Sequence, residues 1–148
     1  MTIPILVRVK APFTRRVIQK IVTAAFRAGG APQAQCEVSL VGDAEMKRLN
    51  FKYRGKNCVT DVLAFGGRKE RRKFLAPSAE TEKYQGEIVI CVPQARRQAK
   101  EYGASIKQEM TRLLVHGALH LLSYDHVRVK DAAVMLPLQE KILERGQF

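Results

Sequence analysis

All three histidines of the chain lie within the segment HGALHLLSYDH at residues 116–126. His116 and His120 are four residues apart, and in an α-helix this spacing places both imidazoles on one face, one turn above the other. Such a pair can present two ring nitrogens to one metal ion. His126 follows six residues later, so a turn of the chain near residue 122 would return a third imidazole to the same face. We therefore predict a metal site with the ligands His116, His120 and His126.

Three protein nitrogens and one open position for water are typical of catalytic zinc, whereas structural zinc sites use four protein ligands. Imidazole ligands without a cage of carboxylates favour one Zn²⁺ ion per chain, although nickel or copper would accept the same ligands. Asp125 would either orient a ligand imidazole through a hydrogen bond or serve only the turn. A helix with ordinary hydrogen-bonded core histidines is the alternative, and it leaves the clustering unexplained.

The same histidine spacing occurs in metzincin peptidases, in which a glutamate follows the first histidine and acts as the general base. Gly117 occupies that position here. A peptidase of this type would lack its base. The motif is therefore compatible with a metal site but indicates against proteolysis.

The chain is strongly basic, with 26 Lys and Arg residues against 14 Asp and Glu, a formal net charge of +12. This charge attracts polyanions. Nucleic acid fits better than anionic lipid because no long basic helix with an aromatic face is present. Two basic clusters are the candidate RNA-binding residues, although each would equally suit a solvated surface: Arg68, Lys69, Arg71, Arg72 and Lys73, and then Arg96, Arg97 and Lys100.

Strands and helices that would position these residues alternate along the chain. Alternating apolar residues predict strands at residues 3–10, 36–41, 59–65 and 87–91. Helical periodicity with glycine and proline boundaries predicts helices at residues 14–28, 43–53, 93–102, 104–122 and 129–144. Pro137 indicates a kink or a restart in the last of these.

This order predicts a mixed α/β fold in one domain, residues 1–148, with about four strands, about five helices and a central histidine-bearing helix. The absence of a long apolar stretch and of a secretory signal predicts a cytoplasmic protein without a membrane span. Cys36, Cys58 and Cys91 lack CxxC spacing and are expected to be reduced, partly buried thiols.

The histidine segment resembles the signature of the YbeY family of bacterial rRNA-maturation endoribonucleases, which is close to HGxLHLxGYDH. Two more segments resemble motifs of that family in the same order. Residues 49–65, LNFKYRGKNCVTDVLAF, correspond to LNxxYRGKDxPTDVLSF, and residues 86–91, GEIVIC, correspond to GDIxIC. The resemblance covers essentially the whole chain. It implies a metal-dependent hydrolase fold, the three histidines as ligands, and Arg54 at the position of a functionally critical arginine.

The resemblance also implies cleavage of single-stranded RNA in the maturation of the 16S rRNA 3′ end and in ribosome quality control. The 16S rRNA precursor and the small ribosomal subunit would then be partners. Two other functions remain open, a non-catalytic ribosome assembly factor with a structural metal and a zinc peptidase-like hydrolase. A monomer is the expectation, although the sequence does not determine the oligomeric state.

A hydrolytic mechanism follows from these residues. Zinc lowers the pKa of its bound water toward ~7, so hydroxide forms without the glutamate that Gly117 replaces. Arg54 offers a planar fork of donors suited to a phosphate. The alternative for Arg54 is an exposed arginine at a helix end.

Four positions depart from the family pattern. Ser123 stands where the family has glycine, and it would cost on the order of 1 kcal/mol if that turn needs a positive φ. Ala64 replaces a serine and removes a hydroxyl, Val59 replaces a proline, and Glu87 replaces an aspartate. No ligand is lost, so we expect these changes to affect efficiency and substrate preference.

Overall fold

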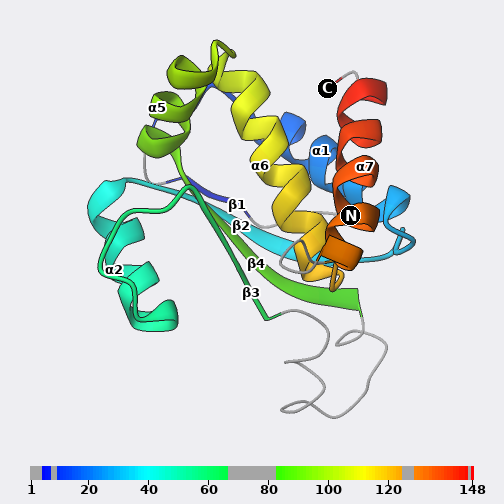
Figure 1. Ribbon diagram of the computed structural model, residues 1–148, viewed down its shortest axis with the longest axis horizontal. Coiled ribbons are helices and arrows are strands. Elements are labelled where there is room, and N and C mark those ends of the chain that lie inside the picture. Colours follow the sequence, from blue (N-terminus) through cyan, green and yellow to red (C-terminus); the bar gives the residue numbers. More distant parts are fainter. Residues whose placement is uncertain (1–4, 8–9, 67–82, 125–128, 147) are drawn as a thin grey trace.

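The computed structural model describes residues 5–7, 10–66, 83–124, 129–146 and 148, which form one sheet with helices on both faces (Figure 1). The predicted mixed α/β class is confirmed. The strands are β1 (Ile5–Val7), β2 (Gln35–Val41), β3 (Val62–Phe65) and β4 (Tyr84–Cys91). The helices are α1 (Arg15–Ala28), α2 (Asp43–Arg54), α5 (Val92–Tyr102), α6 (Ile106–Leu121) and α7 (Val129–Arg145).

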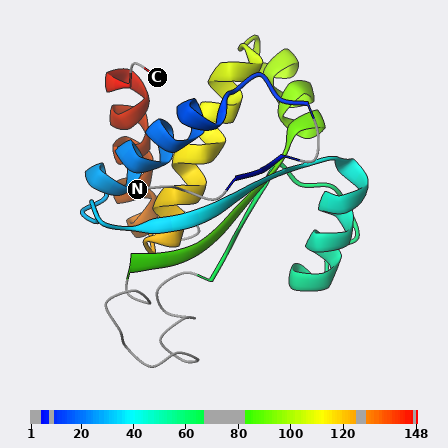
Figure 2. The ribbon, with the colours of Figure 1, turned by 180° about the vertical axis from the view of Figure 1, so that it is seen from behind.

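The strand order in the sheet is β1-β2-β4-β3. Strands β1 and β4 both run parallel to β2, while β3 is antiparallel to β4 and pairs Leu63 with Val89. Seen from behind, β2 crosses the molecule from the end of α1 to the start of α2 (Figure 2). Within the described part of the chain β3 is therefore an edge strand, and this edge borders the candidate site.

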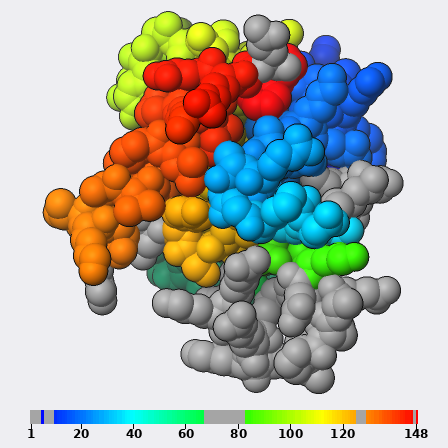
Figure 3. All heavy atoms as spheres, turned by 90° about the vertical axis from the view of Figure 1, so that its right-hand side faces the viewer, coloured from blue at the N-terminus to red at the C-terminus, as the bar shows by residue number. Residues whose placement is uncertain are grey.

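The two faces of the sheet carry different helices. Successive residues of a strand point to opposite faces. Ile88 and Ile90 of β4 pack in a large core with α1, α6 and α7, whereas Val89 and Cys91 pack in a smaller core with Met46 of α2. Helices α1 and α7 lie side by side on the outside of the large core (Figure 3).

Helix α6 is the central helix, as predicted, and it contacts α1, α5, α7, β3 and β4. A capping box begins it, because the Ser105 hydroxyl accepts from the Gln108 N–H and the Gln108 side chain accepts from the Ser105 N–H. A Cβ atom at Gly117 would lie 2.9 Å from Cγ2 of Ile88. The glycine therefore lets α6 approach β4 closely, and the glutamate of a metzincin would not fit there.

A Schellman turn with an unusual residue ends α6. The N–H groups of Ser123 and Tyr124 donate to the carbonyls of His120 and Leu119, at 3.0 and 3.1 Å. Ser123 adopts a left-handed φ of 74°. This is the positive φ for which a serine in place of the family's glycine is expected to cost stability. The Tyr124 hydroxyl donates to the carbonyl of Gly29 at 3.2 Å and ties the turn to the end of α1.

Helix α7 decides between the two alternatives predicted at Pro137. Pro137 lies inside a single helix of 17 residues, so the chain does not restart there. Proline removes one backbone hydrogen bond of a helix. The residues buried around it are Met135, Gln139 and Ile142, and their packing holds the helix together.

None of the helices in the described part of the chain has both the length and the apolar character needed to cross a bilayer.

The three cysteines are free, with Cys36 and Cys91 buried and Cys58 exposed. Burial raises the pKa of Cys36 to about 12 and that of Cys91 to about 11. Both buried thiols therefore stay protonated at neutral pH and behave as small apolar side chains.

Replacing Ser123 by glycine is expected to raise the free energy of unfolding by about 1 kcal/mol, because glycine adopts positive φ without a Cβ clash. Urea denaturation monitored by circular dichroism measures the change. The Ser123→Ala variant is the matched control, since alanine keeps the Cβ and gains nothing. A glycine variant no more stable than the parent would contradict this account of the turn.

Candidate active site

A cleft of about 920 Å³ lies between α6, the edge strand β3, the end of α2 and helix α7. Apolar walls come from β3, α6 and α7. The polar side chains that line the cleft are Tyr53, Arg54, Thr60, Asp61, Arg112, His116, His120 and Gln139. The cleft therefore gathers residues from segments that are far apart in the sequence.

His116 and His120 both line this cleft from α6, so the predicted sharing of one helix face is confirmed. His116 is half-buried and His120 is exposed. Asp125 and His126 lie outside the described residues. Among the residues that the structure describes, no three His, Cys, Asp or Glu side chains form a group that could hold a metal ion. The third ligand therefore stays a prediction.

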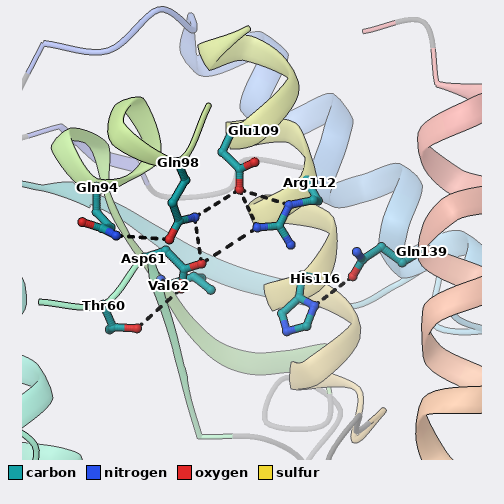
Figure 4. Close-up of polar contacts among 9 residues, drawn as sticks. All are labelled: Thr60, Asp61, Val62, Gln94, Gln98, Glu109, Arg112, His116 and Gln139. Atoms are coloured by element: carbon teal, nitrogen blue, oxygen red, sulfur yellow. Dashed lines mark hydrogen bonds and ion pairs between the residues drawn. The ribbon is translucent and has the colours of Figure 1, made fainter. Parts of the chain in front are cut away.

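Gln139 of α7 orients His116. The Nδ1 atom of His116 lies 2.8 Å from Oε1 of Gln139, an acceptor, and the tautomer that fits this contact carries its proton on Nδ1 (Figure 4). In this tautomer Nε2 carries the lone pair that can bind a metal. Gln139 is only 4% exposed, so the amide is held firmly. A hydrogen bond of this kind supports the ring of a metal-binding histidine, and two imidazoles are ligands that zinc accepts.

Arg54 reaches the same cleft from the last turn of α2. Gly55 ends this helix in the left-handed conformation, with φ 69°. The chain that follows is tied back to α2, because the buried Asn50 donates its side-chain N–H to the carbonyl of Cys58 at 2.9 Å. The exposed Arg54 side chain is thus carried on a well-defined helix end beside the histidines.

Arg112 is a cleft residue that the sequence analysis missed. Its Nε donates to Oε1 of Glu109 at 3.0 Å, its Nη2 also bonds Glu109, and Nη2 lies 3.9 Å from Oδ2 of Asp61. Gln98 of α5 donates to both carboxylates, at 3.1 and 3.3 Å (Figure 4). Burial lowers the pKa of Arg112, but Glu109 and Asp61 outweigh it and raise the pKa overall. The cleft wall therefore carries a fixed cation.

Spacing along α6 could have revealed Arg112, since Glu109 is three residues before it and His116 four residues after it. Side chains at these intervals share one helix face. Gln139 carried no such signal, because its partner His116 is 23 residues away on another helix. Together the two arginines give the cleft positive charge that can attract an anion beside the two histidines.

Basic residues outside the cleft fall into two groups. The cluster Arg68, Lys69, Arg71, Arg72 and Lys73 lies outside the described residues. Arg96, Arg97 and Lys100 are exposed on α5, and none of them lines the cleft.

Arg97 already has a partner, because its guanidinium donates to both carboxylate oxygens of Asp43 at 3.0 and 2.7 Å. The Arg97 hydrogen bond lowers the pKa of Asp43. This pair joins α5 to the start of α2. An RNA phosphate would have to compete with Asp43 for Arg97, so the RNA-binding role of this cluster stays a prediction.

Known proteins with similar sequences point to one family. A family model described as "Endoribonuclease YbeY" matches residues 7–147 of this chain. The chain belongs to the YbeY family. The motifs around His116, Arg54 and Glu87 thus lie within a match that spans nearly the whole chain.

Two YbeY relatives match over most of their own length. The protein named "Endoribonuclease YbeY" in Desulforamulus reducens is 38% identical over 131 residues, which cover 88% of this chain and 84% of the relative. The protein of that name in Moorella thermoacetica is 44% identical over 131 residues, which cover 86% and 81%. The solution structure of TM1509 from Thermotoga maritima has a TM-score of 0.63 at 28% identity, covering 96% of this chain and 87% of that one.

Removing the Gln139 side-chain amide is expected to weaken zinc binding by about 10- to 100-fold, because the histidine ring loses its fixed orientation. Competition with a zinc-binding dye measures the affinity of Gln139→Leu. Gln139→Glu keeps an acceptor opposite His116 and should retain most of the affinity. Thermal unfolding of the metal-free variants separates this effect from a loss of stability. A leucine variant with unchanged zinc affinity would show that Gln139 does not support the site.

Proposed function

We propose that this protein is a zinc-dependent endoribonuclease that cleaves single-stranded RNA. Its substrate would be the 16S rRNA precursor on the small ribosomal subunit in the cytoplasm, where it would mature the rRNA 3′ end. The observation that carries the proposal is the meeting of His116, His120 and Arg54 in one cleft of a YbeY family member. The names of the relatives support the reaction class.

The metal would be held by His116 and His120, with His126 as the predicted third ligand. When bound, Zn²⁺ lowers the pKa of a coordinated water to about 7 and so supplies hydroxide at neutral pH. The tight packing of Gly117 on Ile88 leaves no room for a glutamate base at that position. This favours a phosphodiester substrate over the peptidase alternative.

Arg54 and Arg112 would bind the RNA backbone in the cleft. A guanidinium presents several donors in one plane and can bind two oxygens of a phosphate together. Arg54 is exposed and can follow the charge that builds on the phosphate in the transition state. Arg112 is held by Glu109, so it would contribute a fixed cation one helical turn before His116.

The formal net charge of +12 would draw RNA toward the protein. Backbone binding of this kind releases counterions, so the affinity should fall steeply as salt is added. The basic cluster from Arg68 to Lys73, and the α5 residues Arg96 and Lys100, are the candidate contacts outside the cleft.

Alanine at His116 or at His120 is expected to remove most bound zinc and to abolish the cutting of a single-stranded RNA oligonucleotide. Metal analysis and a gel-based cleavage assay measure the two effects. Each variant is purified in parallel with the parent protein, because trace contaminating ribonuclease would cut with all of them. Full cutting by His120→Ala would end the enzyme proposal. Ribosome association without any cutting would favour the assembly-factor alternative.

Arg54→Ala is expected to lower kcat for RNA cleavage by about 10²- to 10³-fold, the loss typical when one donor to the transition-state charge is removed. Arg54→Lys should fall between alanine and the parent, because lysine keeps the charge but not the planar fork. Arg16→Ala is the matched control, since Arg16 is exposed on α1, does not line the cleft and is not among the proposed RNA contacts. Equal kcat values for Arg54→Ala and Arg16→Ala would remove Arg54 from the mechanism.

A further inference from the structure

A second cavity, of about 220 Å³, lies on the α2 face of the sheet, the face opposite to α6. Its floor is formed by Ser39 of β2 and by Glu87 and Val89 of β4. Glu45 lines it from α2. Ser39 is only 7% exposed, so the floor lies deep beneath the surface of the protein. The volume suits a single small ring system.

Two aromatic residues join this cavity to the cleft. Tyr53 and Phe65 line both hollows, and their ring centroids are 4.7 Å apart with the planes tilted by 53°. Phe65 ends the edge strand β3, and Tyr53 precedes Arg54 in the last turn of α2. Tyr53 is 56% exposed although one side of its ring rests against Phe65. A strand lying in the cleft would therefore meet an aromatic surface where the edge of the sheet opens to the second cavity.

The polar groups of the second cavity exclude phosphate and select a hydrogen-bond donor. Glu87 gives it negative charge in a chain that is otherwise strongly basic, while the charge of Glu45 is partly offset by Arg48, whose Nη2 lies 3.8 Å from its Oε1. The Ser39 hydroxyl donates to Oε1 of Glu87 at 2.7 Å, which fixes the carboxylate in position. An ionised carboxylate accepts hydrogen bonds at two oxygens and donates none. The ligand must therefore bring a donor, and the aromatic residues favour one that is planar.

In a single-stranded RNA, a nucleobase with an exocyclic amino group meets both requirements, because it is planar and its amino group carries two N–H donors. Aromatic side chains stack on unpaired bases, and carboxylates accept from the amino group of cytosine. Uracil has no amino group, and its base can donate only through one ring N–H. A positively charged side chain of a partner protein would also suit the carboxylates, but the basic surface would repel such a partner and the cavity continues the cleft proposed for RNA.

We propose that this second cavity binds one unpaired, amino-bearing base of the RNA strand that lies in the cleft. The base stacks on Tyr53, and its amino group donates to Glu87. This inference rests on the proposed function and deepens it, because it gives the enzyme a base preference near the cleaved bond. A base held in a duplex cannot enter, so the cavity also adds to the preference for single strands.

Binding of short single-stranded RNA oligonucleotides to the metal-free protein tests the proposal without cleavage. The oligonucleotides carry cytosine or uracil at one position at a time and are otherwise identical, and fluorescence anisotropy gives each affinity. At one position cytosine should bind about tenfold more tightly than uracil, the discrimination of one well-made base contact. Tyr53→Ala should lower the affinity for both by about tenfold, whereas Tyr53→Phe should keep it.

Glu87→Gln is the decisive variant, because it replaces one acceptor oxygen by a donor amide of the same shape. It should remove or invert the cytosine preference, and Ser39→Ala should weaken it by releasing the carboxylate. Glu101→Gln makes the same change of charge on the exposed surface of α5, lines neither hollow, and should keep the preference. Thermal unfolding establishes that each variant is folded.

Equal affinity for cytosine and uracil at every position, or a preference that persists in Glu87→Gln, would overturn the proposal. So would displacement of the oligonucleotide by a short arginine-rich peptide from the parent protein but not from Glu87→Gln, since the cavity would then bind a cationic side chain. Failure of the parent protein to bind or cut any single-stranded RNA would instead contradict the proposed function.

Discussion

The close packing of α6 on strand β4 is the constraint on which the candidate site depends. Gly117 lies against Ile88, and a side chain there would push the helix away from the sheet. Protein interiors are packed too densely to absorb such a shift without loss of stability. His116, His120 and Arg112 are carried on this helix, so the contact sets their distance from the edge strand β3 and from Arg54. At the position where a metzincin peptidase has its base, this chain has a glycine whose packing contact positions the face with the two histidines.

Conformational strain and charge pairing are both concentrated around that helix. Its last turn holds Ser123 at a positive φ, and the Tyr124 hydroxyl anchors the same turn to α1. Such strain persists only where the surrounding structure supports it, and it is common at functional sites. At the cleft wall, Glu109 and Asp61 hold Arg112, which keeps the cation in place before any substrate binds. The cleft thus combines an arginine that is held by two carboxylates on its wall with a more exposed arginine at the end of α2.

Much of the fold and part of the site could be predicted because their signals are local. Alternating apolar residues gave the strands, and capping residues and glycines gave the helix ends. The spacing of His116 and His120 was enough to place both side chains on one face, since helical geometry alone determines it. The glycine preference of the turn at Ser123 was also a local property of the backbone. Pro137 left open whether the last helix is continuous, and the buried side chains around it, which outweigh one missing hydrogen bond, decide for a single helix.

Contacts between distant segments carried no such signal. The sequence by itself determined the class of fold, the helix that bears the histidines, the family and the basic character of the chain, because each of these follows from residue type and short-range spacing. Only the tertiary structure decided that Gln139 supports His116, that Asp61 and Glu109 hold Arg112, and that Tyr53 and Phe65 are shared by two hollows. These arrangements depend on how helices and strands pack against one another, and many sequence separations are compatible with the same contact.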